Sequence, residues 1–230
     1  MRTINVIAHV YSDFTTKFGI PRQSGLVDTR AEVVFLPPYN QVEAVKGLEE
    51  FTHIWLLWEF SENIRKEGSW SATVRPPRLG GNTRKGVFAT RSPFRPNPIG
   101  LSCVKLEKIT YDERGPVLHI VGADLMNGTP IYDVKPYVTY SDCRPDAVGG
   151  FSEKVYDYKL QVVIPEELKK KLGEENLEIL CKILEQDPRP SYQDDPKRIY
   201  GMEYGGRDIR FTVCEGVLTV TELVEISEKG

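Results

Sequence analysis

Short strand-like segments fill the first two-thirds of this 230-residue chain, and they limit its fold more than any other feature. Six stretches are rich in Val, Ile and Tyr, and several alternate apolar with polar residues, as half-buried antiparallel strands do. They comprise residues 4–10, 31–36, 53–60, 102–111, 116–124 and 131–140. The one helical candidate in this half is 41–51. Because few helices are available to connect parallel strands, the pattern predicts an antiparallel β-barrel or β-sandwich.

A turn signal, Asn127-Gly128, separates the last two of these strand-like stretches. This dipeptide favours a tight primed turn, which needs positive φ at both central positions. We therefore expect the two strands on either side of it to pair as a β-hairpin.

The character of the chain changes near Gly149-Gly150. Beyond it, leucines and isoleucines in 166–185 fall near helical spacing, and Gly173 predicts a division into two helices. A stiff polar connector follows at 187–192, and the remaining strand-like stretches are 154–164, 198–204, 207–214 and 217–226. The sequence thus predicts a mainly β protein with two domains, an antiparallel β-barrel over 1–150 and a small α+β domain over 151–230.

Composition narrows the location and the chemistry of the protein. No apolar stretch approaches the length of a membrane span, and no signal peptide precedes the first strand-like residues, so we expect a cytoplasmic protein. The cysteines are scattered without a CxxC pair, which argues against a zinc site and predicts small buried hydrophobic residues: Cys103, Cys143, Cys181 and Cys214. GxGxxG and P-loop patterns are absent, so a nucleotide-like cofactor needs a less common architecture.

A basic, proline-stiffened segment lies inside this otherwise acidic chain. Residues 68–106 contain no Asp or Glu but seven Lys or Arg, without which the formal charge of −3 would be −10. Such an asymmetry indicates an anionic partner that docks at one place. Pro93, Pro96 and Pro98 fix their own φ angles and restrict the residues before them, so the loop is preorganised.

The same segment carries a resemblance to a known family. Residues 86–102, Gly-Val-Phe-Ala-Thr-Arg-Ser-Pro-Phe-Arg-Pro-Asn-Pro-Ile-Gly-Leu-Ser, resemble the signature of the TsaA-like family. Its characterised bacterial members are tRNA threonylcarbamoyladenosine methyltransferases of the TrmO type. Further matching segments cover nearly the whole chain, at 18–23, 47–55, 75–82, 127–130 and 187–192.

The resemblance implies an enzyme that binds S-adenosylmethionine (AdoMet) on an all-β barrel. The implied reaction is methylation of N6 of threonylcarbamoyladenosine next to the anticodon of certain tRNAs, by a homodimer whose cofactor pockets lie near the subunit interface. Methyl transfer from a sulfonium is an in-line displacement, which requires neither a protein nucleophile nor a metal. Alignment of donor and acceptor therefore supplies much of the acceleration.

The resemblance also assigns AdoMet contacts to five places in the chain. They are a polar turn, the end of the strand 53–60, two positions flanking the proline-stiffened loop, and the stretch before Asn127-Gly128. The implied contacts are Pro21, Arg22, Gln23, Ser61, Glu62, Arg91, Leu101, Val121, Gly122, Ala123 and Asp124.

The acceptor nitrogen is a poor nucleophile that must lose a proton, so a base is expected. Asp124 and Asp133 are the candidates, and Tyr132 is a third for which a packing role is the alternative. Basic side chains would bind the anticodon loop through its phosphates or pair with the threonyl carboxylate. The expected RNA contacts are Arg75, Arg78, Arg84, Lys85 and Arg95, with Arg189 and Tyr192 as further contacts or parts of a structural connector.

Two alternative functions stay open at this point. A methyltransferase acting on another acceptor would keep the same cofactor site. A non-catalytic barrel that binds AdoMet or RNA would keep both ligands without turnover, because a fold and a ligand site do not by themselves establish a reaction.

Overall fold

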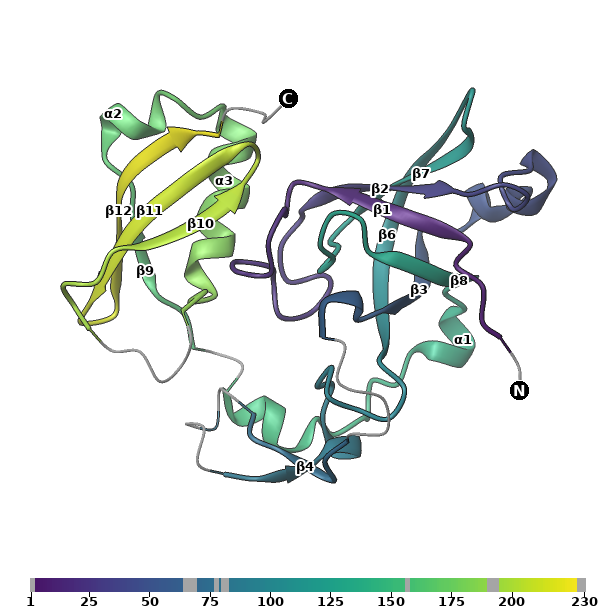
Figure 1. Ribbon diagram of the computed structural model, residues 1–230, viewed down its shortest axis with the longest axis horizontal. Coiled ribbons are helices and arrows are strands. Elements are labelled where there is room, and N and C mark those ends of the chain that lie inside the picture. The colour runs from purple at the N-terminus through teal and green to yellow at the C-terminus, as the bar shows by residue number, and fades with distance from the viewer. Residues whose placement is uncertain are drawn as a thin grey trace.

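The computed structural model of the protein describes residues 3–63, 70–76, 79, 83–155, 158–189 and 195–226. Figure 1 shows a barrel formed by the first half of the chain, a separate C-terminal sheet with its helices, and a small two-stranded ribbon below the barrel. The ribbon pairs β4 (Thr73–Val74) with β5 (Lys85–Gly86) and continues into a 3-10 turn, η5 (Val87–Ala89).

The barrel is closed and antiparallel throughout, which confirms the predicted fold class. Its strands are β1 (Ala8–Ser12), β2 (Arg30–Phe35), β3 (His53–Glu59), β6 (Ile99–Asp112), β7 (Gly115–Val121) and β8 (Pro130–Pro136). They run in the order β1-β2-β7-β6-β3-β8, and the pairing of β8 with β1 closes the ring. Alternate side chains such as Ile54 and Leu56 of β3 point inward and fill the core.

The predicted hairpin at Asn127-Gly128 is wrong. β7 pairs with β2 and β6, whereas β8 pairs with β3 and β1, so the two strands are not neighbours. Their connection crosses the end of the barrel, where the Gly128 N–H donates to the Val10 carbonyl at 2.7 Å. Gly128 alone of the pair has positive φ (80°), and the Thr129 N–H donates to the Met126 carbonyl, as in a type II turn. The dipeptide indicated a turn but not which strands it joins.

Several other boundaries differ from those expected. The first strand begins at Ala8, and β8 ends at Pro136 before a helical turn, α1 (Thr139–Asp142). Positive φ at Gly47 splits the helical candidate 41–51 into two 3-10 turns, η1 (Val42–Val45) and η2 (Leu48–Glu50). Cys143 and Cys214 are exposed and the other two cysteines half-buried, so the prediction of buried cysteines is wrong.

The C-terminal unit is a four-stranded sheet with a helix packed against it. Of 154–164 only the short β9 (Gln161–Val163) is a strand, and η6 (Gly150–Val155) precedes it. The other elements were predicted. Gly173 separates two helices, α2 (Glu166–Lys169) and α3 (Glu174–Glu185). The sheet is completed by β10 (Tyr200–Tyr204), β11 (Arg207–Cys214) and β12 (Val217–Glu225), in the order β10-β11-β12-β9. Neither these helices nor any other in the described residues is long and apolar enough to cross a membrane.

The loop between β1 and β2 joins the two units. Phe14 and Val27 are buried in the core of the C-terminal unit, and Phe18 packs against the same core. The Phe18 and Phe211 rings stack with centroids 6.4 Å apart. A loop of the barrel is therefore folded against the C-terminal sheet, and its conformation depends on both units.

Candidate active site

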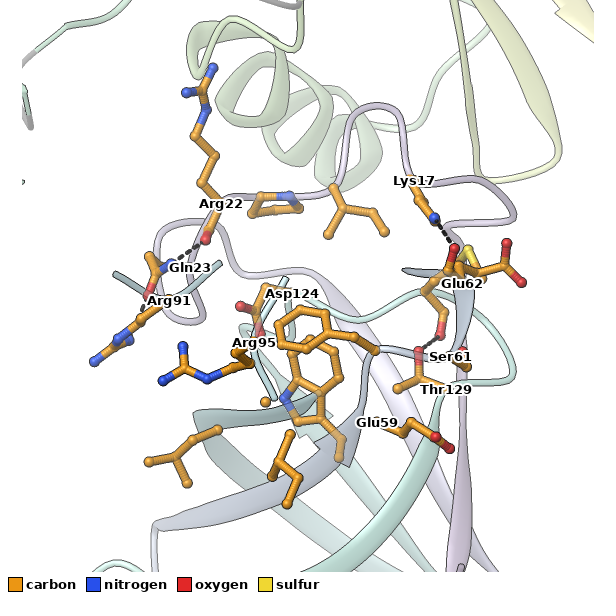
Figure 2. A pocket seen from close by; sticks show the side chains of 18 of the residues that line it. Lys17, Arg22, Gln23, Glu59, Ser61, Glu62, Arg91, Arg95, Asp124 and Thr129 are labelled. Atoms are coloured by element: carbon orange, nitrogen blue, oxygen red, sulfur yellow. Dashed lines mark hydrogen bonds between the residues drawn. The ribbon is translucent and has the colours of Figure 1, made fainter. Parts of the chain in front are cut away.

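A pocket of about 430 Å³ lies at the end of the barrel, between the ends of β3 and β6 and the β1–β2 loop. Its volume suits a small organic molecule. Figure 2 shows Asp124 and Arg95 at its centre, with Gln23 and Arg91 on one side and Lys17, Glu62 and Ser61 on the other. We call the side formed by strands β3 and β6 with Asp124 the barrel wall, and residues 17–23 the loop wall.

Hydrogen bonds fix the carboxylate of the barrel wall. The Trp58 indole N–H donates to Ser102 Oγ at 3.0 Å, and the Ser102 hydroxyl donates to Asp124 Oδ1 at 2.6 Å. Ser102 is fully buried because it occupies an inward position of β6. This relay of Trp58, Ser102 and Asp124 orients a carboxylate that lines the pocket.

The Trp58 ring lies directly on the backbone of Gly100. A Cβ at Gly100 would stand 2.2 Å from Trp58 Cε2, far inside van der Waals contact. The adjacent Phe60 ring meets Trp58 at 4.3 Å between centroids with planes at 60°. The indole is thus held between a glycine and a second aromatic ring, and it lines the pocket.

The charge state of Asp124 depends on competing effects. Burial raises the pKa of its carboxyl above the ordinary 3.8, while the hydrogen bond from Ser102 and the nearby Arg91 guanidinium oppose that shift. An ionised carboxylate here is poorly solvated. A cationic ligand group placed beside it would therefore be held more strongly than at an exposed carboxylate.

The loop wall reaches the barrel through side-chain hydrogen bonds. The Arg91 guanidinium donates to Gln23 Oε1, and the Gln23 amide donates to the Arg22 carbonyl, as Figure 2 shows. Pro21 is buried beneath this turn. At the opposite rim Lys17 Nζ donates to the Glu62 carbonyl at 2.7 Å, in η3 (Ser61–Asn63) just after β3.

The C-terminal unit supports the loop wall from behind. The Arg22 guanidinium points away from the pocket and donates to the Asp187 carbonyl at 3.0 Å. Both Asp187 carboxylate oxygens accept from the Arg189 guanidinium, at 2.9 and 3.0 Å, and the Tyr158 hydroxyl donates to the same carboxylate at 3.1 Å. Gly19 lies against Met202, where a Cβ would stand 2.0 Å from Sδ.

The pocket gathers most of the residues that the resemblance implied for AdoMet. They come from four distant parts of the chain: Pro21, Arg22, Gln23, Ser61, Glu62, Arg91, Leu101 and Asp124. Val121, Gly122 and Ala123 are not among the lining residues. Instead the Gly122 N–H donates to the Thr29 carbonyl and the Ala123 carbonyl accepts from the Thr29 hydroxyl, so this stretch anchors the base of the β1–β2 loop.

The three candidate bases lie in different places. Asp124 lines the pocket, whereas Asp133 is on the outer face of β8, 2.9 Å from Lys135 Nζ, and is not a lining residue. Burial and the neighbouring Glu59 raise the pKa of Tyr132 to about 12, so this phenol keeps its proton at neutral pH. The geometry therefore favours Asp124 among the three.

The residues expected to contact RNA also lie in different places. Arg75 and Arg84 are exposed beside a second, larger groove of about 1940 Å³, and Arg95 lines the pocket itself. Lys85 lies over the Phe151 ring at 5.3 Å. The Arg189 side chain is 9% exposed and paired with Asp187, which favours the connector interpretation. Arg78 and Tyr192 lie outside the described residues.

Sequence analysis missed the residues that position the carboxylate. Trp58 is one of the apolar residues of a predicted strand, and Ser102 ends the signature segment without an assigned role. The available signal was a hydroxyl at an inward position of an otherwise apolar strand face, since buried polar groups are normally hydrogen-bonded. Its two partners are 44 and 22 residues away, so no local pattern could name them.

Family models match both parts of the chain. The model described as the tRNA-methyltransferase O N-terminal domain matches residues 9–143, and the TrmO C-terminal domain matches residues 157–226. Together they cover the barrel and the C-terminal sheet. The match to two successive domain models agrees with the motifs that the sequence carries.

Relatives extend the likeness over nearly the full length. A protein from Escherichia coli (strain K12) named tRNA (adenine(37)-N6)-methyltransferase is 38% identical over 228 residues, 94% of this chain and 95% of its own. One of the same name from Eikenella corrodens is 42% identical over 177 residues, 76% of this chain and 98% of its own. The crystal structure of TrmO from Pseudomonas aeruginosa aligns with a TM-score of 0.76 at 31% identity, covering 97% of this chain and 98% of that chain. The chain belongs to the tRNA-methyltransferase O (TrmO) family.

Proposed function

We propose that this protein methylates N6 of adenosine 37, beside the tRNA anticodon, with AdoMet as the methyl donor. The observation that carries the proposal is a small-molecule pocket with one partly desolvated carboxylate, in a chain of this family. A relative matched over nearly its full length is named for this reaction, and one from Pseudomonas aeruginosa carries the name "Putative S-adenosylmethionine-dependent methyltransferase RcsF".

The pocket residues fit such a donor. Its adenosyl and amino-acid parts need flat apolar surface and hydrogen-bonding groups, and its sulfonium needs negative charge. Trp58, Phe60 and Leu101 supply the apolar surface, and Asp124 supplies the charge. When bound, AdoMet supplies an activated methyl group whose transfer is an in-line displacement.

Asp124 has two roles in the proposal. Its ionised carboxylate holds the donor's positive charge at the end of the barrel, where Ser102 and Trp58 fix its orientation. It also accepts the proton that the acceptor nitrogen loses, because a raised pKa makes a carboxylate a better proton acceptor. Asp133 remains a second candidate whose exposed position on β8 suits it less.

The acceptor side is basic. Arg75, Arg84, Lys85 and Arg95 are proposed to bind the anticodon loop, whose unstacked bases are accessible to a protein. One of these arginines, or Arg91, is proposed to pair with the threonyl carboxylate of a threonylcarbamoylated adenosine. Such a bidentate pair would distinguish the modified from the unmodified base.

Four further expectations accompany the function. The chain divides into domains 1–150 and 151–230, works in the cytoplasm, needs no metal, and forms a homodimer. Support for the dimer comes from Ile99 and Leu101, which line the pocket and are exposed on the outer face of β6. Large apolar side chains clustered in this way mark interaction sites.

Methyl transfer from labelled AdoMet tests the proposal. The acceptors are tRNA purified with and without its threonylcarbamoyl group, and mass spectrometry of the nucleosides identifies the product. We expect label on the threonylcarbamoylated tRNA alone, and at least a tenfold lower rate with Asp124→Asn. Label on another molecule would support the first alternative function. AdoMet and tRNA binding without label would support the non-catalytic barrel.

A further inference from the structure

Two exposed aromatic rings stand together beside the β4–β5 ribbon. Trp70 is 52% and Phe88 72% exposed, and their rings stack with centroids 6.3 Å apart and planes at 30°. Phe88 is in the 3-10 turn η5, whose neighbouring Val87 is 1% exposed. The Val87 N–H donates to the Ala72 carbonyl at 2.9 Å and so ties the segments that carry the two rings. The aromatic pair is therefore presented to solvent by anchored backbone.

The surroundings of this pair are strongly basic. Phe88 lines the larger groove together with Arg75 and Arg84, and the Arg84 guanidinium donates to Thr73 Oγ1 at 2.9 Å. Glu153, a carboxylate on this groove, accepts from the Gly149 N–H. Thr90 and Arg91 line both the groove and the AdoMet pocket, so the two are continuous only two residues beyond Phe88. A chain that enters the pocket from this side passes the aromatic pair.

We propose that Trp70 and Phe88 form a stacking platform for an unstacked base that flanks the methylated adenosine. This rests on the proposed function, in which the substrate is an RNA loop. Aromatic rings beside arginines are the usual means of binding single-stranded nucleic acid, since every base has a π-face and every nucleotide a phosphate. A second copy of this chain is a less suitable occupant. A symmetric contact would place the same patch on both sides and bring Arg75 and Arg84 against like charges.

Steady-state kinetics on threonylcarbamoylated tRNA test the platform. Trp70→Ala and Phe88→Ala are each expected to raise the KM for tRNA about tenfold, because each removes a ring on which a base stacks, with AdoMet affinity unchanged. Phe88→Tyr keeps a ring and should restore KM, whereas Phe88→Leu keeps apolar area and should not. The matched control is Tyr140→Ala, which removes a ring that is 89% exposed on α1. Equal KM values for Phe88→Leu and the wild type would overturn the proposal.

A second measurement does not depend on turnover. An anticodon stem-loop RNA with 2-aminopurine next to the target adenosine reports stacking as fluorescence quenching. We expect quenching with the wild type and its loss with Phe88→Leu. Quenching that persists in Phe88→Leu refutes the platform even if methyl transfer succeeds. Quenching that is lost in Phe88→Leu, without any methyl transfer by the wild type, refutes the proposed function alone. Light scattering provides the last check. If the molar mass of Phe88→Ala in solution is half that of the wild type, the rings belong to a contact between copies and the platform is refuted.

Discussion

The two walls of the pocket are held in different ways. The barrel wall is built from a closed antiparallel sheet, and its carboxylate is fixed by the buried relay of Trp58, Ser102 and Asp124. The loop wall has no regular secondary structure and is kept in place by Arg22 on Asp187 and Gly19 on Met202. The carboxylate proposed for the chemistry is therefore held by the barrel, while the shape of the site depends on the C-terminal unit.

The largest effect is expected at Asp187, which is on the C-terminal side of the loop wall. Asp187→Ala removes the carboxylate that accepts from the Arg189 guanidinium and the Tyr158 hydroxyl, and breaking a buried ion pair costs about 3–5 kcal/mol. AdoMet affinity should fall with stability, because the Asp187 carboxylate holds in place the backbone carbonyl to which Arg22 donates. Urea unfolding and calorimetric titration measure the two. The control is Asp195→Ala, which removes an exposed carboxylate in the same unit and should alter neither the stability nor the AdoMet affinity.

A glycine in the barrel wall is expected to matter nearly as much. Gly100→Ala drives a methyl group into the Trp58 ring and should cost about 1–3 kcal/mol of stability, as overpacking does. The displaced indole should also weaken AdoMet binding about tenfold. Gly86→Ala is the matched variant, since its Cβ meets no atom within 4 Å and its φ is −57°. If both variants unfold at the same urea concentration, the packing described for Trp58 is wrong.

Removing the Ser102 hydroxyl from the relay is expected to have a smaller effect. Ser102→Ala leaves the buried Trp58 N–H without its acceptor, which costs about 1–3 kcal/mol. It also removes the hydrogen bond that lowers the pKa of Asp124, so that pKa should rise further. The pH below which AdoMet affinity falls should move upward in this variant. A pH profile that coincides with that of the wild type would show that the hydroxyl does not act on the carboxylate.

The smallest effect concerns stability and pH at Asp124. Because burial raises its pKa, the ionised carboxylate destabilises the folded state as pH rises through the native pKa, and this penalty is absent below the unfolded value. Asp124→Asn should therefore be at least as stable as the wild type at pH 7, with the difference vanishing near pH 3. AdoMet binding should nevertheless be about tenfold weaker and independent of pH. Thermal melts and titrations over this range decide both points.

The strands of the barrel wall were predictable from the sequence, whereas the contacts that hold the loop wall in place were not. Alternation in β6 indicated a strand with one buried face, the apolar run of β3 indicated another strand, and the signature residues Arg91 and Leu101 follow from the family resemblance. The partners of Arg22 and Gly19 lie more than 160 residues away in a different unit. No periodicity or local motif encodes such contacts, because they depend on how the C-terminal sheet meets the β1–β2 loop.

The strand order shows the same limit. Asn127-Gly128 correctly marked a turn, but the turn belongs to a connection across the barrel end and not to a hairpin. Barrel closure selects the pairing through contacts between β8 and both β1 and β3. Local turn chemistry is compatible with either arrangement.

A crystal structure of the protein with AdoMet tests the central claim most directly. We predict that the donor occupies the pocket and contacts both walls, with its sulfonium within about 4 Å of the Asp124 carboxylate and its other groups against residues 21–23. A donor bound elsewhere, or one that contacts the barrel wall while residues 17–23 stand apart from it, would contradict the account.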